Sequence, residues 1–387
     1  MNRLPAGVVA LGFVSLLMDV SSEMIHSLLP IFMVGVLGAS ALVVGVIEGV
    51  AEATAAITKI FSGAVSDWLG RRKPLLLLGY GLAALTKPLF PLATGIGAVM
   101  TARFIDRIGK GIRGAPRDAL VADLTPPEQR GAAYGLRQSM DTVGAFLGPA
   151  LALALMAATA GDFRLVFWFA AAPAFLCVAV IAFGIREPEA AAPAAPRRFP
   201  IRRAELARLP PGFWQVTAFA AILTLARFSE AFLLLRAENV GLSATWIPAI
   251  MIVMNITYAA SAYPFGRMSD DGGRHGLLAL GIGFLIAADL ILALAGNAWT
   301  VGFGAVFWGL HMGATQGLLS ALVAEAAPAD LRGTAFGIFN LLTGIVLLVA
   351  SVLAGGLWTL LGPAATFLAG AAFAAVALPG LLRHRAA

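Results

Sequence analysis

Apolar segments long enough to cross a lipid bilayer follow one another along almost the whole chain. A helix needs about 20 predominantly apolar residues to span the hydrocarbon core. Segments of roughly that length lie on both sides of a polar stretch at 186–212. Those before it are 6–36, 40–65, 74–93, 95–120, 131–157 and 164–185. Those after it are 213–236, 244–266, 276–296, 298–323, 333–360 and 363–382. A lone strand in lipid would leave its backbone unpaired. The sequence therefore predicts an all-α membrane protein with twelve transmembrane helices.

Composition excludes the main alternative, a water-soluble protein. Hydrophobic residues make up 59% of the 387 and charged residues only 12%, whereas a soluble globular domain carries roughly 25% charge. The net charge of +6 does not indicate a nucleic-acid partner, because the basic residues are distributed among the connections between spans. Cys177 is the only cysteine, which excludes a disulfide framework. The first apolar stretch contains Asp19 and Glu23, so it predicts a retained span rather than a signal peptide.

The distribution of lysine and arginine predicts the orientation. They concentrate in the two termini and in the alternate connections 66–73, 121–130, 186–212, 267–275 and 324–332. The remaining connections hold only Arg164 and Arg236. By the positive-inside rule, we expect both termini on the cytoplasmic side of the membrane. The expected membrane is a bacterial-type inner (plasma) membrane. We therefore expect a first bundle at 1–185, a cytoplasmic linker at 186–212 and a second bundle at 213–387.

Two short motifs recur at nearly the same offset, which indicates an internal duplication. GAVSDWLGRRK at Gly63–Lys73 returns as GRMSDDGGRH at Gly266–His275, 203 positions downstream. EQRGAAYG returns as DLRGTAFG at an offset of 202, with Arg130 matching Arg332. The pattern predicts two homologous six-helix halves related by a pseudo-twofold axis.

Ionisable residues inside the predicted spans concentrate in the first half and fall in stripes. A charge at the bilayer centre costs about 3 kcal/mol or more, so these side chains must face a polar interior or one another. The candidates for proton coupling or for binding a substrate or cation are Asp19, Glu23, His26, Glu48, Glu52, Arg103, Asp106, Arg107, Lys110, Arg137 and Asp141. Internal pairing stays open for several of them: Glu48 and Glu52 with Lys59 or Arg103, Arg107 with Asp141, and Asp19, Glu23 and His26 with the arginines of the fourth span.

The duplicated motif resembles the loop motif between helices 2 and 3 of the major facilitator superfamily (MFS). RIGKGIRGA at Arg107–Ala115 is similar to the family's fourth-helix motif, although Lys110 replaces the usual amide and Arg113 a usual glycine. GAFLGPALA resembles the fifth-helix signature of the drug:proton antiporter branch through Gly144, Gly148 and Pro149, with leucine and alanine in place of its trailing glycine pair. The resemblance implies alternating access and a cytoplasmic gate formed by Gly63, Asp67, Gly70, Arg71 and Arg72, with Asp270 and Arg274 in the second copy.

These observations predict a secondary transporter, and the antiporter resemblance favours proton-coupled efflux of a small organic solute or drug. One alternative is export of a divalent metal bound by Asp19, Glu23 and His26, because carboxylate and imidazole donors suit first-row ions. A transporter-like membrane sensor is a second, and an organic anion as substrate ranks last. In the second half, the cavity-lining candidates are Tyr258, Asn255, Trp308, His311 and Asn340.

Enzymatic and ATP-driven functions lack sequence support. The chain contains no phosphate-binding loop, no HExxH and no GxSxG motif. We therefore expect no cofactor and no catalytic residue. The expected partners are the solute or ion, protons and the lipid bilayer, and the expected oligomeric state is a monomer.

Overall fold

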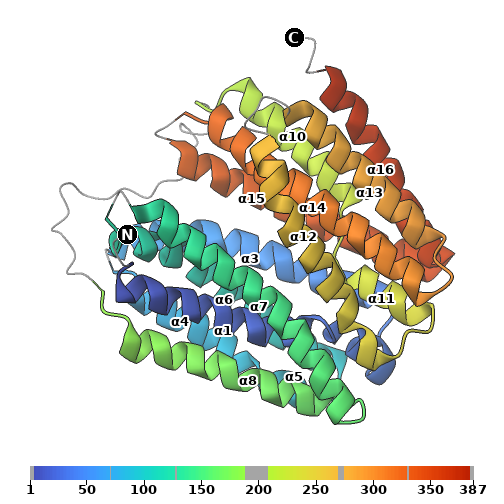
Figure 1. The fold of residues 1–387 in the computed structure, drawn as a ribbon, viewed down its shortest axis with the longest axis horizontal. Helices are drawn as coiled ribbons and strands as arrows, with labels where there is room; N and C mark the ends of the chain where they lie inside the picture. Colours follow the sequence, from blue (N-terminus) through green and yellow to red (C-terminus); the bar gives the residue numbers. More distant parts are fainter. Residues whose placement is uncertain are drawn as a thin grey trace. The chain divides into compact units, whose positions relative to one another are not determined.

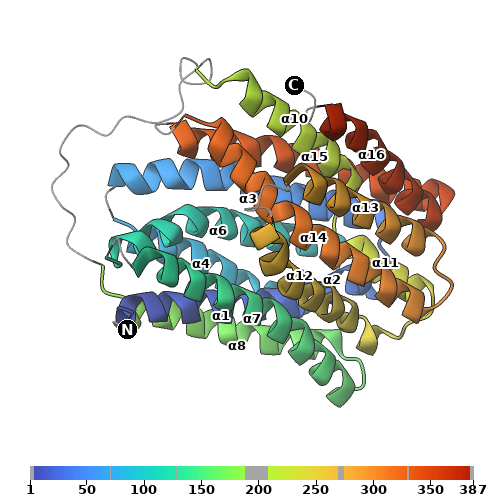
Figure 2. The same ribbon diagram turned by 45° about the horizontal axis from the view of Figure 1, so that its top comes forward.

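The computed structural model describes residues 4–69, 71–126, 129–187, 208–268, 274–328 and 331–383, and within these ranges the regular structure is helical (Figures 1 and 2). Nine helices in the described part are long and apolar enough to cross a membrane. Large apolar side chains such as Phe183 and Trp299, both 89% exposed, lie on the outside, which is the arrangement that lipid requires. The helical membrane class is confirmed, while the count of twelve spans and the twofold symmetry stay predictions.

Contacts between Cα atoms divide the chain into two compact units. Unit 1 contains residues 1–29 and 54–200, and unit 2 contains residues 30–53 and 201–387. The grouping of 30–53 with unit 2 was not predicted, because the sequence-based boundaries placed it in the first bundle. Most of the proposed linker lies outside the described residues.

Unit 1 is built on helix α1, which packs between α7 and α8, while α4 packs against α6 (Figures 1 and 2). Its helices are α1 (Ala6–His26), α4 (Lys73–Thr86), α5 (Leu89–Leu92), α6 (Ile96–Asp123), α7 (Arg130–Ala158), α8 (Phe163–Ala179) and the π-helical turn η3 (Val180–Gly184). Leu11 and Met18 of α1, Tyr80 of α4 and Cys177 of α8 belong to one buried core. Cys177 is thus a core residue, and its thiol donates to the Val14 carbonyl over 3.3 Å.

Unit 2 is arranged around α13, which packs against α14 and α16, while α12 packs on α14. Its elements are α10 (Pro211–Ala226), α11 (Ala231–Asn239), η4 (Ala244–Trp246), α12 (Pro248–Met268), α13 (Arg274–Ala293), α14 (Ala298–Ala326), α15 (Arg332–Leu361), α16 (Pro363–Arg383), and, from the N-terminal part of the chain, α2 (Leu29–Ile31) and the π-helical turn η1 (Phe32–Val36). Helix α3 (Ala41–Leu69) contributes its first half to this unit.

Glycines explain why the first half of α3 belongs with α15. A Cβ atom on Gly49 would lie 2.9 Å from Leu348 Cα, and one on Gly355 would lie 2.6 Å from the Ala41 carbonyl oxygen. Contacts that close are not available to a residue with a side chain. The two backbones therefore meet along a surface that only glycine permits.

Three of the predicted spans are interrupted in their interior. Helix α1 ends at His26 and α4 ends at Thr86, and a proline follows within four residues in each case, at Pro30 and Pro88. Proline lacks the amide donor that a continuing helix needs. In unit 2, α10 stops at Ala226 and α11 starts at Ala231 with no proline between them. Half-helix ends inside a span expose backbone dipoles, a feature of transporter binding sites.

Candidate functional site

Three buried charges of unit 1 form a triad centred on Asp106 of α6. Lys87 Nζ lies 3.0 Å from Asp106 Oδ1, and Arg107 Nη2 lies 2.8 Å from Oδ2. The side chains of Lys87 and Asp106 are only 2% and 3% exposed. Lys87 sits at the break between α4 and α5 and also donates to Ser22 Oγ of α1 over 3.1 Å. The triad therefore joins three helices, and both oxygens of Asp106 are occupied by cations.

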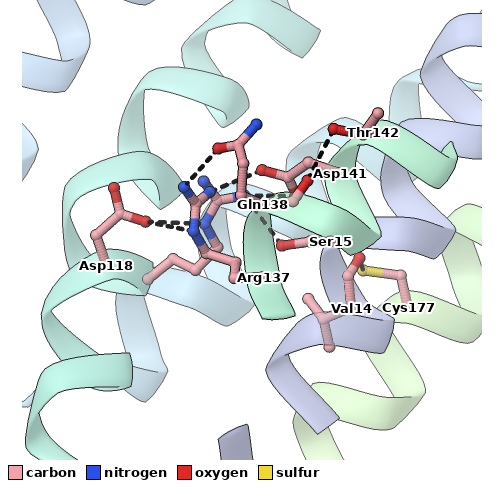
Figure 3. Close-up of polar contacts among 9 residues, drawn as sticks. Val14, Ser15, Asp118, Arg137, Gln138, Asp141, Thr142 and Cys177 are labelled. Carbon is pink, nitrogen blue, oxygen red and sulfur yellow. Dashed lines mark hydrogen bonds and ion pairs between the residues drawn. The ribbon is translucent and has the colours of Figure 1, made fainter. Parts of the chain in front are cut away.

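A second network connects α6 with α7 nearer the protein surface (Figure 3). Asp141 accepts from Arg137 Nη1 over 2.7 Å and lies 3.8 Å from Arg117 Nη1. Asp118 Oδ1 lies 3.2 Å from Arg117 Nε and 3.7 Å from Arg137 Nε. Arg117 also donates to Ser15 Oγ of α1 over 3.1 Å. Two carboxylates thus share two guanidiniums, and the Asp141 side chain keeps 18% of its surface exposed.

The acidic face of α1 lies directly against the glycines of α7. A Cβ on Gly144 would lie 2.8 Å from Asp19 Cβ, and a Cβ on Gly148 would lie 2.5 Å from Glu23 Cβ. The spacing of four residues is the same on both helices, so one turn of α7 matches one turn of α1. Glu23 also lies 3.6 Å from His26 Nδ1. The Gly-Pro motif and the acidic stripe, which were predicted separately, therefore form one helix contact.

The other candidates of the first half are distributed more widely. Arg103 is buried on α6, and Lys110, on the same helix, is exposed. Glu48 is buried and Glu52 half-buried on the part of α3 that belongs to unit 2. No group of three histidine, cysteine or acidic side chains placed to hold a metal ion occurs within the described ranges.

The second-half candidates gather around α14. His311 is buried, and its Nδ1 lies 2.8 Å from the Gly281 carbonyl oxygen of α13. Trp308 is fully buried against Phe228, with ring centroids 5.7 Å apart. Tyr258 of α12 donates to Gln316 Oε1 of α14 over 3.2 Å. Asn255 and Asn340 are half-buried on α12 and α15.

Part of the predicted cytoplasmic gate falls within the described structure. Arg72 donates from Nη1 to Ser66 Oγ over 2.7 Å and from Nε to Asp123 Oδ2 over 3.4 Å. Arg71 is exposed, and a Cβ on Gly63 would lie 3.3 Å from Ala115 Cβ of α6. Gly70, Asp270 and the side chains of Asp67 and Arg274 lie outside the described parts, so their role in a gate stays a prediction.

Sequence reasoning missed two polar residues that the structure places at helix ends. Lys87, the partner of Asp106, was not selected, although a single lysine before a proline inside an apolar span was a usable signal. Arg236 was treated only as a loop charge. Its guanidinium donates to the carbonyls of Leu292, Ala293 and Ala295, at and just beyond the C-terminal end of α13. Such a cation at a helix C-terminus stabilises the last carbonyls.

Comparison with known proteins gives the family. The model of the Major Facilitator Superfamily matches residues 11–237 and 231–386. An uncharacterized MFS-type transporter of Methanocaldococcus jannaschii is 33% identical over 400 residues, covering 98% of this chain and 95% of the relative. The multidrug resistance protein MdtH of Photorhabdus laumondii is 33% identical over 156 residues, covering 40% of this chain and 38% of that protein.

Solved structures agree on the fold. The crystal structure of the nucleoside transporter NupG superposes with a TM-score of 0.81 over 97% of this chain and 99% of that one, at 12% identity. A sequence identity that low supports a shared fold but gives no information about the substrate. The family model and the archaeal relative both cover nearly the whole chain, and the chain therefore belongs to the Major Facilitator Superfamily of membrane transporters.

Proposed function

We propose that this transporter exports a small organic solute in exchange for protons, by alternating access. Its partial similarity to a protein named for multidrug resistance supports export of this solute class. The antiporter-like glycines of α7, packed on the acidic face of α1, support proton coupling. Inner-membrane location with both termini in the cytoplasm belongs to the same proposal.

The observation that carries the proposal is the position of Asp141 between two arginines. Its carboxylate is paired with Arg137 and near Arg117, yet it keeps contact with the surface. Protonation would remove one of the two carboxylate charges that the guanidiniums share, leaving Asp118 alone between them, and so weaken the contact between α6 and α7. An ion pair that breaks when the carboxylate is protonated and forms again when the proton leaves would couple proton uptake to helix movement.

The test is solute-driven proton movement in inverted membrane vesicles. A pH-sensitive dye reports proton release when a solute such as ethidium is added to energised vesicles. We expect Asp141→Asn and Glu23→Gln to abolish this signal while the protein is still made and inserted. Asp162→Asn is the matched control, because Asp162 is exposed and only caps α8 through Leu165 N, which asparagine also does. Unchanged coupling in both test variants would remove the two acids from the mechanism.

The same assay separates the alternatives. Metal export has only the Glu23 and His26 pair as structural support in the described part of the chain, and it predicts uptake of cobalt or zinc in place of an organic cation. A sensor that moves nothing predicts no solute-dependent proton signal with any substrate.

A further inference from the structure

Asp289 is a buried acid in unit 2 that none of the predicted sites includes. It lies on α13 within an otherwise apolar sequence, GLLALGIGFLIAADLILA. Its side chain is 0% exposed, and within the described part of the chain neither carboxylate oxygen has a hydrogen-bond partner. An unpaired ionised carboxylate in such surroundings costs far more than a neutral acid. The position is therefore unexplained by packing or by pairing.

The carboxyl group lies at the broken span of unit 2. A Cβ on Gly370 of α16 would lie 2.6 Å from Asp289 Oδ2 and 3.1 Å from the Ala226 carbonyl oxygen. Gly370 thus leaves room for the acid beside the last residue of α10. The C-terminal end of a helix carries partial negative charge, which disfavours an anion there and suits the O–H of a protonated acid.

The charged groups nearest Asp289 in the described structure form no hydrogen bond to it. They include Arg236 of α11, whose guanidinium binds the Leu292 carbonyl one turn farther along α13. On α14 the nearest titratable side chain is His311, which is held at Gly281, two helical turns along α13. Helix α16 has no ionisable residue before Arg383. Arg227 and Glu230 occupy the break between α10 and α11, and Arg227 donates no hydrogen bond to either Asp289 oxygen in the described structure. The acid has no resident counter-ion among these groups.

We propose that Asp289 is a proton-binding site of unit 2 that exchanges its proton with water when the α10–α11 break rearranges. In binding, a carboxylate oxygen takes a proton from hydronium and leaves water; in release, the O–H bond breaks and the proton returns to water. A metal cation is disfavoured, because one carboxyl and one carbonyl are far fewer oxygens than a hard cation requires. The role of this site in transport rests on the proposed proton coupling, whereas the protonation itself does not.

Infrared spectroscopy of the full chain in lipid tests the protonation directly. The carbonyl stretch of a protonated carboxylic acid is separate from the bands of ionised carboxylates. We expect a wild-type band at neutral pH that is lost in Asp289→Asn, retained in Asp162→Asn, and lost in the wild type at alkaline pH. Asp289→Asn keeping the full wild-type band would overturn the proposal, as would a band that does not titrate or that sodium removes at constant pH.

A second pair of variants checks the location. Gly370→Ala adds a methyl group against Asp289 and should shift the band, whereas Gly283→Ala, on α13 with open space around it, should leave it unchanged. An unshifted band in Gly370→Ala would contradict the placement of the protonated group.

The vesicle assay then distinguishes the two proposals. If Asp289→Asn retains solute-driven proton movement equal to the wild type, the inference about Asp289 fails while proton-coupled export stands. If no solute moves protons in the wild type but the Asp289 band titrates, the proposed function fails while the proton site stands.

Discussion

Asp106 is a single buried anion that faces two cations in the interior of unit 1. Its two oxygens contact Lys87 and Arg107, one on each. Breaking a buried pair is costly because the remaining partner keeps its charge in a poorly solvating environment. The three members of this triad are therefore not equivalent, because one anion faces two cations.

This asymmetry gives a stability prediction. Asp106→Asn removes the anion that both cations contact and should lower the free energy of unfolding by about 3–5 kcal/mol. Lys87→Met leaves Asp106 with Arg107 and should cost clearly less. The midpoint of thermal unfolding in detergent, followed by tryptophan fluorescence, measures both. A loss in Lys87→Met as large as that in Asp106→Asn would show that Lys87 has a role beyond the pair.

Helix contacts in this protein depend on glycines that face polar or backbone atoms of the neighbouring helix. Gly144 and Gly148 allow α7 to reach Asp19 and Glu23 of α1. The fifth-helix motif was identified from sequence by resemblance, and the acidic stripe by its helical spacing. That the two meet was not predictable, because spacing defines a face of one helix and says nothing about the helix that covers it.

The α1–α7 contact predicts a matched pair of variants. Gly148→Ala places a methyl group 2.5 Å from Glu23 Cβ, so the helices must separate, at a cost of about 1–3 kcal/mol. Gly135→Ala on the same helix has open space around it and should be neutral or slightly stabilising. Unfolding midpoints of the two variants provide the comparison, and equal midpoints would contradict the close contact.

A second pair of glycine variants, this time at adjacent positions, tests the contact between α3 and α15. Gly355→Ala brings a methyl group within 2.6 Å of the Ala41 carbonyl oxygen and should destabilise by about 1–3 kcal/mol. Gly356→Ala, one residue later and with open space, should stabilise by up to about 1 kcal/mol through helix propensity. Opposite signs in the unfolding free energy are the expected result, and two neutral variants would place α3 elsewhere.

At the scale of the whole molecule, the first predicted span of each predicted half, 6–36 and 213–236, is interrupted in its interior. The interruptions after His26 and after Ala226 place Ser27 and Ser229 at the offset of 202 that also relates the duplicated motifs. The interruption after Thr86 has no such counterpart, because α13 runs unbroken from Arg274 to Ala293 at that offset. A duplication that includes the first pair of breaks stays a prediction.

The predicted orientation is testable with the single native cysteine removed. In a Cys177→Ser background, Ser243→Cys should react with a membrane-impermeant thiol reagent added outside the cell. Pro126→Cys should react only after the membrane is opened. Both positions are exposed in the described structure. The reverse pattern would place both termini outside.

The sequence alone determined the helical membrane class and the family, and it identified the acidic, basic and glycine residues of the first half, because these follow from local composition, periodicity and motifs. Only the tertiary structure decided which charges meet: Lys87 with Asp106, Asp141 with Arg137, and Asp289 with no partner in the described chain. The physical reason is that the cost of burying a charge can be read from one helix, whereas the partner that offsets it comes from another.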